Sequence, residues 1–144
     1  MLFLDVVNSG TVPVLERVLT YTQVRHRMLS ENIANLDTPG YKTRQLDVRA
    51  FQKSLQAAIE KRQPGHSLPQ VQGNREFKES SSGLLEITPT QEPAENILFH
   101  DRTNARVERQ MAMLAENTMM YQIASDRLKG RFDELMSAIR GRVS

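Results

Sequence analysis

The longest apolar pattern in the chain runs through residues 104–141. Its positions alternate in steps of four and three, which is the heptad spacing of a helix that packs along another helix. They are Val107, Met111, Leu114, Thr118, Tyr121, Ser125, Leu128, Phe132, Leu135 and Ile139. A second group of apolar residues lies beside this seam, at Met113, Met120, Ile123, Ala124 and Met136. The pattern predicts one long helix with two apolar faces, which needs more than one neighbour.

A second long helix is predicted over residues 9–37, with Thr11 and Pro13 as a typical helix start. Its apolar residues at helical spacing are Leu15, Val18, Leu19, Leu29, Ile33 and Leu36. The segment Asp37-Thr38-Pro39-Gly40 ends it, with Pro and Gly in the two central positions of a type II turn. We expect the two long helices to pack as an antiparallel, coiled-coil-like hairpin. This pairing would bury the main seam of each helix and leave the second face of the C-terminal helix exposed.

The middle of the chain is less regular. Residues 46–62 predict a short helix, marked by Leu46, Phe51, Leu55, Ala58 and Ile59. Four of the six prolines and three of the seven glycines fall between residues 64 and 93, which favours loops, with one short strand over 84–88 and a hairpin at most. The expected fold is mainly α and forms a single domain. Its regions are an N-terminal helical region (1–62), an irregular middle (63–103) and a C-terminal long helix (104–144).

Composition narrows the class of protein. The 144 residues suffice for one domain, and the formal net charge is only +2, with acidic residues interleaved among the basic ones. We therefore expect no nucleic-acid partner. The absence of cysteine excludes disulfides, thiolate metal sites and a cysteine nucleophile. No apolar run reaches the length of a membrane span, and Asp5 interrupts the short apolar start, so we expect no cleaved secretory signal.

The search for catalytic chemistry finds no set of residues to assign. The three histidines, His26, His66 and His100, form no metal-binding pair, and His100 with Asp101 and Glu95 would still lack a fixed third ligand. The sequence contains no nucleophile elbow and no glycine-rich phosphate loop. We therefore assign no catalytic, cofactor-binding or metal-binding residue, and we expect no small-molecule substrate.

Residues 29–42 resemble the N-terminal signature of the bacterial flagellar rod and hook family. The specific part is Asn32-Ile33-Ala34-Asn35 followed by Thr38-Pro39-Gly40-Tyr41. The stretch 107–122 is similar to the terminal helix of that family, and the short length together with the run 131–135 is most similar to its proximal-rod members. One departure is Asp101-Arg102-Thr103-Asn104, where family members often carry a Gly- or Asn-rich turn. Read physically, Asn32 and Asn35 can hydrogen-bond either to backbone or to a neighbouring chain.

The resemblance implies a structural subunit of the flagellar basal body. Such subunits are exported without a cleaved signal by the flagellar type III secretion apparatus. In the rod, their terminal helices form a hollow tube that transmits torque and conducts exported subunits. The implied partners are copies of this chain, other rod proteins, and components of the basal-body base and export gate. The implied location is the rod, in the periplasmic space. The seam residues listed above other than Ser125, together with Leu15, Val18, Leu29 and Leu36, are the expected assembly interface.

Two other classes of function remain possible from the residues alone. A soluble helical adaptor or export chaperone of the same secretion system would use the same heptads to bind one partner and would stay in the cytoplasm. A small enzyme with an unrecognised site is the third possibility, and the sequence assigns it no residues.

Overall fold

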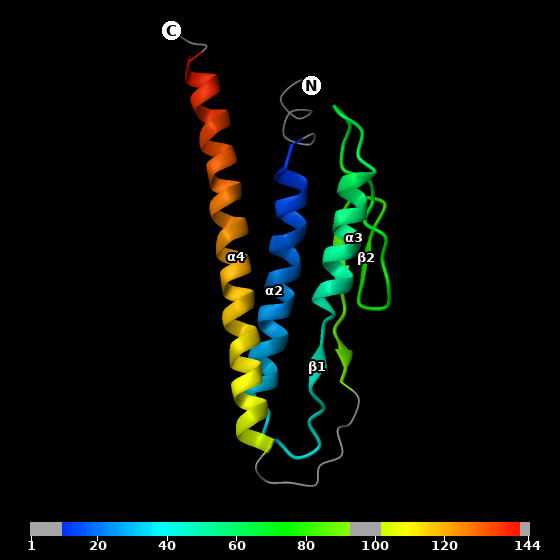
Figure 1. The fold of residues 1–144 in the computed structure, drawn as a ribbon, viewed down its shortest axis with the longest axis vertical. Helices are drawn as coiled ribbons and strands as arrows, with labels where there is room; N and C mark the ends of the chain where they lie inside the picture. The colour runs from blue at the N-terminus through cyan, green and yellow to red at the C-terminus, as the bar shows by residue number, and fades with distance from the viewer. Residues whose placement is uncertain (1–9, 93–101, 142–144) are drawn as a thin grey trace.

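The fold is built from two long helices, one shorter helix and two pairs of short strands (Figure 1). The computed structural model describes residues 10–92 and 102–141, with side chains from residue 106 onward in the second range. Its elements are α2 (Val12–Ala34), β1 (Arg44–Gln45), α3 (Val48–Glu60), β2 (Phe77–Glu79), β3 (Leu85–Ile87), β4 (Thr90–Gln91) and α4 (Arg102–Gly141). The mainly helical class predicted from the sequence is confirmed.

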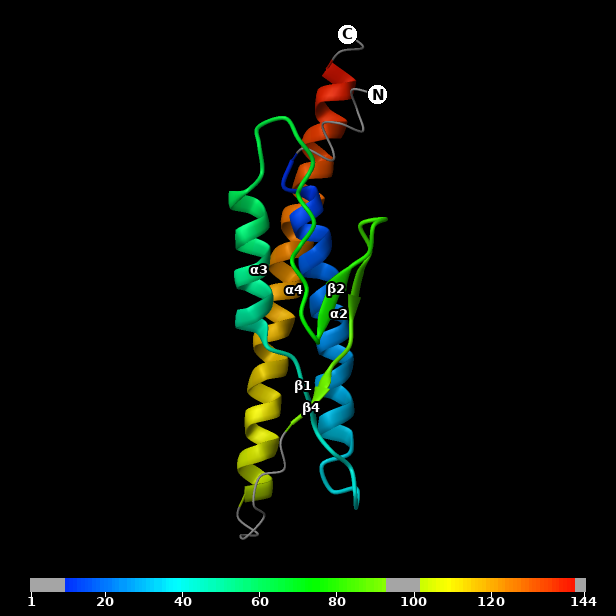
Figure 2. The same cartoon turned by 90° about the vertical axis from the view of Figure 1, so that its right-hand side faces the viewer.

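The two long helices, α2 and α4, lie side by side and antiparallel (Figure 1). α3 and the β2–β3 hairpin pack on the other side of α2, as the turned view in Figure 2 shows. α2 is therefore the central element, with α4 on one side and the middle of the chain on the other. The predicted hairpin of terminal helices is confirmed.

The helix bounds differ from the expected ones by a few residues. α2 ends at Ala34 instead of residue 37, because the Asn35 N–H turns back to the Glu31 and Asn32 carbonyls. Thr11 is at the N-cap position, but its side chain makes no cap hydrogen bond, and its hydroxyl instead accepts from Arg131 Nε at 3.1 Å. Residue 9, the expected start, lies outside the described residues. α3 is two residues shorter at each end than the predicted 46–62.

The start of α3 is held by two carboxylates. Asp47 is the N-cap, and its side chain accepts from the Ala50 N–H at 3.0 Å. The buried Glu76 accepts from the Asp47 N–H at 2.7 Å and, through its other oxygen, from the Thr90 hydroxyl at 2.8 Å. A carboxylate is favoured at this end of a helix because unpaired backbone N–H groups and the helix dipole meet there. Glu76 thus fixes α3 to the middle segment.

The middle contains the expected hairpin and one pairing that the sequence did not reveal. β2 and β3 are antiparallel with Phe77 opposite Ile87, and Gly83 in their turn has φ of 82°. β1 and β4 also pair antiparallel, with Arg44 opposite Gln91. The described residues therefore contain one strand pair more than the single hairpin that the sequence predicted. Strands of two residues carry no periodicity that a sequence pattern could detect. Phe99, a possible anchor, lies outside the described residues.

The core lies mainly between α2, α3 and β2. Tyr21 stacks on Phe51 with ring centroids 3.9 Å apart, and Phe77 meets Phe51 edge-on at 5.5 Å. All three rings are nearly or fully buried, and such aromatic pairs add stability beyond the area they bury. α4 reaches this cluster from the side through Met113 and Leu114, which are partly buried against it.

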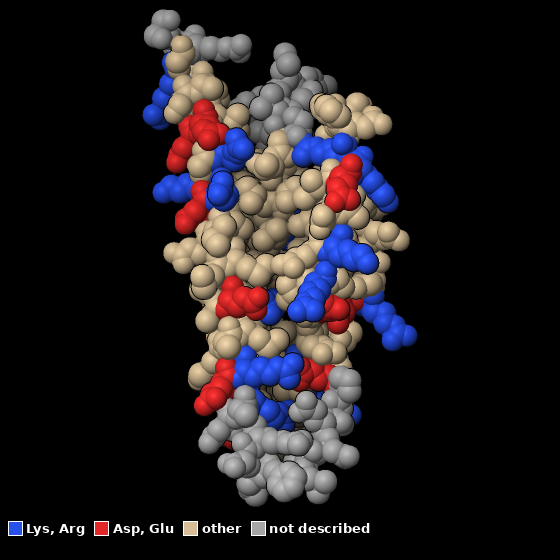
Figure 3. All heavy atoms as spheres, in the orientation of Figure 1, with Lys and Arg blue, Asp and Glu red and all other residues tan. Residues whose placement is uncertain are grey.

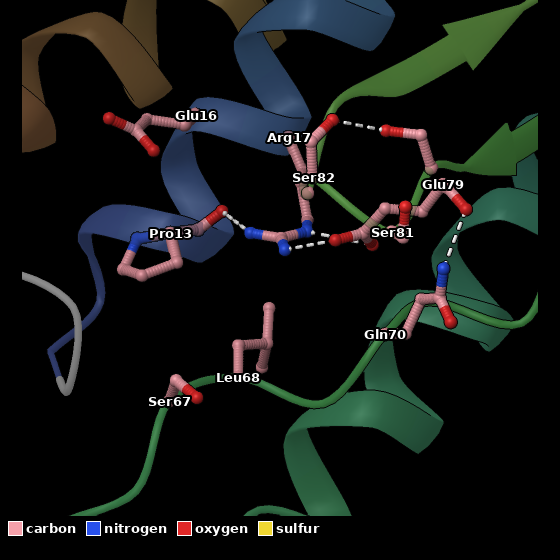
Figure 4. Close-up of a pocket in the computed structure, with 11 residues that line it drawn as sticks. Pro13, Glu16, Arg17, Ser67, Leu68, Gln70, Glu79, Ser81 and Ser82 are labelled. Atoms are coloured by element: carbon pink, nitrogen blue, oxygen red, sulfur yellow. Dashed lines mark hydrogen bonds and ion pairs between the residues drawn. The ribbon is translucent and has the colours of Figure 1, made fainter.

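An ion pair attaches the β2–β3 hairpin to α2 (Figure 4). Arg17 grips the Glu79 carboxylate with two nitrogens, Nε at 3.1 Å and Nη2, while Nη1 donates to the Pro13 carbonyl at 2.8 Å. The Glu79 side chain is 2% exposed, and it also accepts from the Val71 N–H at 2.9 Å. A paired and fully hydrogen-bonded carboxylate is one that a fold can bury. The surrounding pocket is lined by Ser67, Leu68, Gln70 and Ser80–Gly83, besides the residues of the pair.

Because Tyr21 is buried, the free energy of unfolding depends on pH in the alkaline range. Its hydroxyl has no hydrogen-bond partner, and burial raises the pKa of Tyr21 well above its ordinary value of 10.0, against a smaller lowering by Arg25. Above about pH 10 the unfolded chain loses this proton while the folded chain keeps it, so the free energy of unfolding falls by up to about 1.4 kcal/mol per pH unit. We expect Tyr21→Phe to remove this component and to cost nothing at pH 7. The check is urea unfolding of both chains from pH 7 to 11, and parallel pH profiles would contradict it.

Candidate assembly interface

Asn32, near the end of α2, joins three parts of the chain. Its Nδ2 donates to the Arg44 carbonyl at 2.7 Å, and its Oδ1 accepts from the Arg44 N–H at 3.0 Å. Nδ2 also donates to Gln110 Oε1 at 3.3 Å, and Oδ1 accepts from the Tyr41 hydroxyl at 3.0 Å. Asn32 is fully buried and uses the whole capacity of its amide. Of the two alternatives for Asn32, the structure therefore shows the internal one.

The turn after α2 has the geometry that its residues predict. The Tyr41 N–H donates to the Thr38 carbonyl at 3.2 Å, and Gly40 has φ of 78°. Asn35 closes the helix end, with Nδ2 donating to the Glu31 carbonyl at 2.8 Å and Oδ1 accepting from the Thr38 hydroxyl at 3.3 Å. Burial raises the pKa of Tyr41, which keeps its hydroxyl a donor to Asn32. Pro39 and Gly40 are exposed, Ala34 is exposed, and Ile33 is half-buried.

The face of α4 that packs against α2 differs from the predicted seam. Gln110, Asn117 and Ala124, one heptad apart, are 4%, 0% and 3% exposed. Half of the predicted seam lies beside this line, and four of its five positions are half-buried: Val107, Leu114, Leu128 and Leu135, with Tyr121 exposed at 40%. The expectation that the hairpin buries the whole apolar seam is wrong. Two of the three buried residues are amides, and each of them makes a hydrogen bond to α2.

The other half of the predicted seam lies on the outer flank of α4, except that Thr118 lines a groove between α4 and α2. Its positions, again one heptad apart, are Met111, Thr118, Ser125, Phe132 and Ile139. Met111 is 53% exposed, and Phe132 and Ile139 are each 44% exposed. Met136, also exposed, lies one turn from Phe132. We call Met111, Phe132, Met136 and Ile139 the outer stripe. Part of the second face, in contrast, packs inward: Ala124 is buried, and Met113 and Met120 are half-buried.

The predicted interface residues of α2 lie mostly inside the subunit. Leu29 is fully buried in the core, and Val18 packs against the core cluster. Leu15 and Leu36 are half-buried. The predicted interface residues of α2 are therefore mostly buried by contacts within the chain, whereas α4 keeps the exposed outer stripe.

Sequence reasoning missed three buried polar residues between the long helices. Asn117 Nδ2 donates to the Thr22 carbonyl at 2.8 Å, and Gln110 pairs with Asn32 as described. Arg25 is 2% exposed and reaches only the exposed Glu116, at 3.5 Å. A pattern search ranks positions by apolar character, so it passes over an amide or guanidinium that is buried because it is hydrogen-bonded. The usable signal was the seven-residue spacing of Gln110 and Asn117 beside an apolar line.

Other chemistry is sparse in the part of the chain that the structure describes. Within residues 10–92 and 106–141, no three His, Asp or Glu side chains gather as a metal site would require. His100 and Asp101 lie outside these ranges. None of the described helices combines the length and the apolar content that crossing a bilayer requires. Positive and negative side chains are interspersed over the face in Figure 3.

Comparison with known proteins connects this geometry to a family. The flagella basal body rod protein family matches residues 16–42, which cover most of α2 and the turn closed by Asn32 and Gly40. Similarity extends over nearly the whole chain in the flagellar basal body rod protein FlgB of Bacillus subtilis (strain 168), with 25% identity over 133 residues, 92% of this chain and 95% of that protein. The chain is therefore similar to flagellar basal body rod proteins.

Other bacteria carry similar proteins. The FlgB rod protein of Borrelia hermsii is 29% identical over 118 residues, covering 78% of this chain and 83% of its own length. That of Salmonella typhimurium is 23% identical over 133 residues, covering 88% and 90%. The resemblance read from residues 29–42 is thereby confirmed, and Asn32 and the turn at Gly40 are parts of the subunit's own fold.

Asn32 should carry more of the stability than the neighbouring signature residue Asn35. Asn32→Leu removes four hydrogen bonds and leaves the Arg44 N–H and C=O without their partner, so we expect a loss of about 2–4 kcal/mol. Asn35→Ala, in the same turn, should lose about 1 kcal/mol or less, because its contacts lie near solvent. Urea unfolding followed by circular dichroism measures both. Equal losses would refute the role given to Asn32.

The turn at Gly40 is a matter of backbone conformation alone. A Cβ on Gly40 would meet nothing within 4 Å, so any effect of substitution comes from its positive φ. We expect Gly40→Val to destabilise the chain by about 1–2 kcal/mol and Gly40→Asn to stay close to the parent, since Asn tolerates this region. Thermal unfolding of the two variants compares them directly. Equal midpoints would mean that the turn relaxes to a negative φ.

Proposed function

We propose that this chain is a structural subunit of the flagellar proximal rod, and that it has no catalytic role. In this proposal its terminal helices build the wall of a hollow tube, which transmits torque and conducts exported subunits. The partners are copies of the chain, other rod proteins and the base and export-gate components of the basal body. The chain reaches the rod in the periplasmic space through the flagellar type III secretion apparatus, without a cleaved signal.

The observation that carries the proposal is the outer stripe on α4. Met111, Phe132, Met136 and Ile139 leave roughly half of each side chain in water, and no described element of the subunit covers them. Exposed apolar side chains that recur along one helix face are typical of an interaction site. Methionine adapts to differently shaped partners, which suits a subunit with non-identical neighbours. Similarity to flagellar rod proteins supports the same interpretation.

A soluble adaptor or export chaperone is the alternative function. It would use the outer stripe to hold one partner in the cytoplasm. The two functions differ in where the chain ends up, since a rod subunit leaves the cytoplasm and a chaperone remains there. Retention of the full chain in the cytoplasm of an export-competent strain would contradict the structural proposal and support the adaptor.

Charging the outer stripe tests the proposal. Met111 and Phe132 are exposed, so the double variant Met111→Lys, Phe132→Lys should keep its melting temperature within about 2 °C while placing two charges in an interface that assembly buries. We expect normal export, no incorporation into isolated rods, and loss of swimming. The measurements are the melting curve, the exported amount and the rod content.

The matched control is Ser137→Lys. Ser137 is exposed and lies on a different face of α4, on the heptad line of Arg109, Glu116 and Ile123. It should fold, leave the cell and enter rods like the parent. Incorporation of the Met111→Lys, Phe132→Lys chain at the parental level would refute the outer stripe as an assembly surface.

A further inference from the structure

The seam between α2 and α4 carries polar contacts along its length. Besides the long contact between Arg25 and Glu116, three hydrogen bonds cross it: Asn32 Nδ2 to Gln110 Oε1 at 3.3 Å, Asn117 Nδ2 to the Thr22 carbonyl at 2.8 Å, and Arg131 Nε to Thr11 Oγ at 3.1 Å. The outermost two are 21 residues apart on each helix, from Thr11 to Asn32 and from Gln110 to Arg131. All three therefore fit one antiparallel alignment. We call them the polar ladder.

Apolar contacts alone do not define this alignment. α4 offers two apolar heptad lines of similar length, one from Val107 to Leu135 and one from Met111 to Ile139. Leucine and methionine side chains fit several partner shapes, so a slip of one heptad would still bury apolar area. A slip of one heptad would, however, bring one of the two amides, Gln110 or Asn117, to the level of the other and leave at least one of them without its partner. An unpaired buried amide is strongly penalised. Buried amides are known to fix alignment in coiled coils for this reason.

We propose that the polar ladder selects both the face of α4 that pairs with α2 and the register of that pairing. Gln110 and Asn117 are its specificity-determining residues, since both are buried on the line that α2 covers. The outer stripe is consequently kept free for other partners. The ladder belongs to the single chain, so this inference does not depend on the proposed rod function.

A seam that is aligned by polar contacts is expected to be less stable than an apolar one, and buried polar groups without partners occur in it. Asn117 Oδ1 and two nitrogens of Arg25, Nε and Nη1, are buried without partners. The Arg25 contact with Glu116 is long at 3.5 Å, and the Glu116 side chain is 63% exposed. A seam selected for stability alone would carry apolar residues at these positions. These groups lie level with one another, because residues 22 and 25 of α2 face residues 117 and 116 of α4.

Register can be read with pairs of introduced cysteines, because the natural chain has none. Gln23 and Thr118 line the same groove between α2 and α4, so Gln23→Cys with Thr118→Cys reports the observed register. Gln23→Cys with Ser125→Cys reports a slip of one heptad, about 10 Å along the helix. The rates of intramolecular cross-linking by a short bifunctional maleimide are compared in the dilute full-length chain.

The two buried contacts of the ladder are removed by Gln110→Leu with Asn117→Leu, and the exposed contact between Arg131 and Thr11 remains. With the ladder intact we expect the observed-register pair to react about tenfold faster than the slipped pair, and without its two buried contacts we expect rates within about twofold. A matched control, Leu128→Met, changes a half-buried seam residue without touching a hydrogen bond and should keep the parental ratio.

Each result decides the inference. A ratio that stays near tenfold in a helical Gln110→Leu, Asn117→Leu chain would overturn it, because apolar packing would then set the register. If that chain loses its helical circular dichroism signal, Asn117→Leu alone is measured, with an intermediate ratio expected. Loss of helix in both variants would also overturn the inference, since the amides would then supply stability and not selection.

Discussion

The pairing between the Asn32 amide and the backbone of Arg44 is the contact on which the rest of this fold depends. The Asn32 side chain pairs with Arg44 as the backbone of a neighbouring strand would. Its Nδ2 donates to the Arg44 carbonyl, and its Oδ1 accepts from the Arg44 N–H. This brings the chain back along α2 as soon as it leaves the turn, and β1 can then pair with β4. Because Asn32 also reaches Gln110 on α4, one buried side chain fixes the two long helices and the middle segment relative to each other. No apolar residue offers this bidentate geometry.

Residues with strong local chemistry were predictable from the sequence. Pro39 and Gly40 predicted a turn whose hydrogen bond and positive φ the structure confirms. The long helices were predictable because their apolar positions recur over many turns. The β1–β4 pair was not, since two residues carry no period and their pairing is set by Asn32 and by the contact between the Glu92 N–H and the Thr43 carbonyl at 2.8 Å. The bounds of α2 and α3 shifted because Asn35 and Asp47 act as caps, which apolar spacing does not register.

The inward face of α4 shows where periodicity fails as a guide to packing. The sequence correctly predicted an apolar seam on this helix, but the seam is not centred on α2. One half of it is mostly half-buried beside α2, and the other half is largely exposed. Gln110 and Asn117 move the buried face by about one heptad line, because a buried amide with a partner is stable and one without a partner is not. Periodicity counts how many apolar residues share a face, whereas burial depends on whether the polar ones find partners.

This separation of faces gives α4 two kinds of contact with different energetics. Toward α2 it makes directional bonds at fixed positions, with unpaired groups at Arg25 and Asn117 that hold stability below what an apolar seam would reach. Away from α2 it presents Met111, Phe132, Met136 and Ile139, whose burial would be favourable against many shapes and imposes little register. A hairpin with that balance has a defined internal geometry and a permissive outer surface. A subunit that meets different neighbours at different heights of an assembly requires both properties, because an error in the hairpin register would displace every residue of the outer surface together.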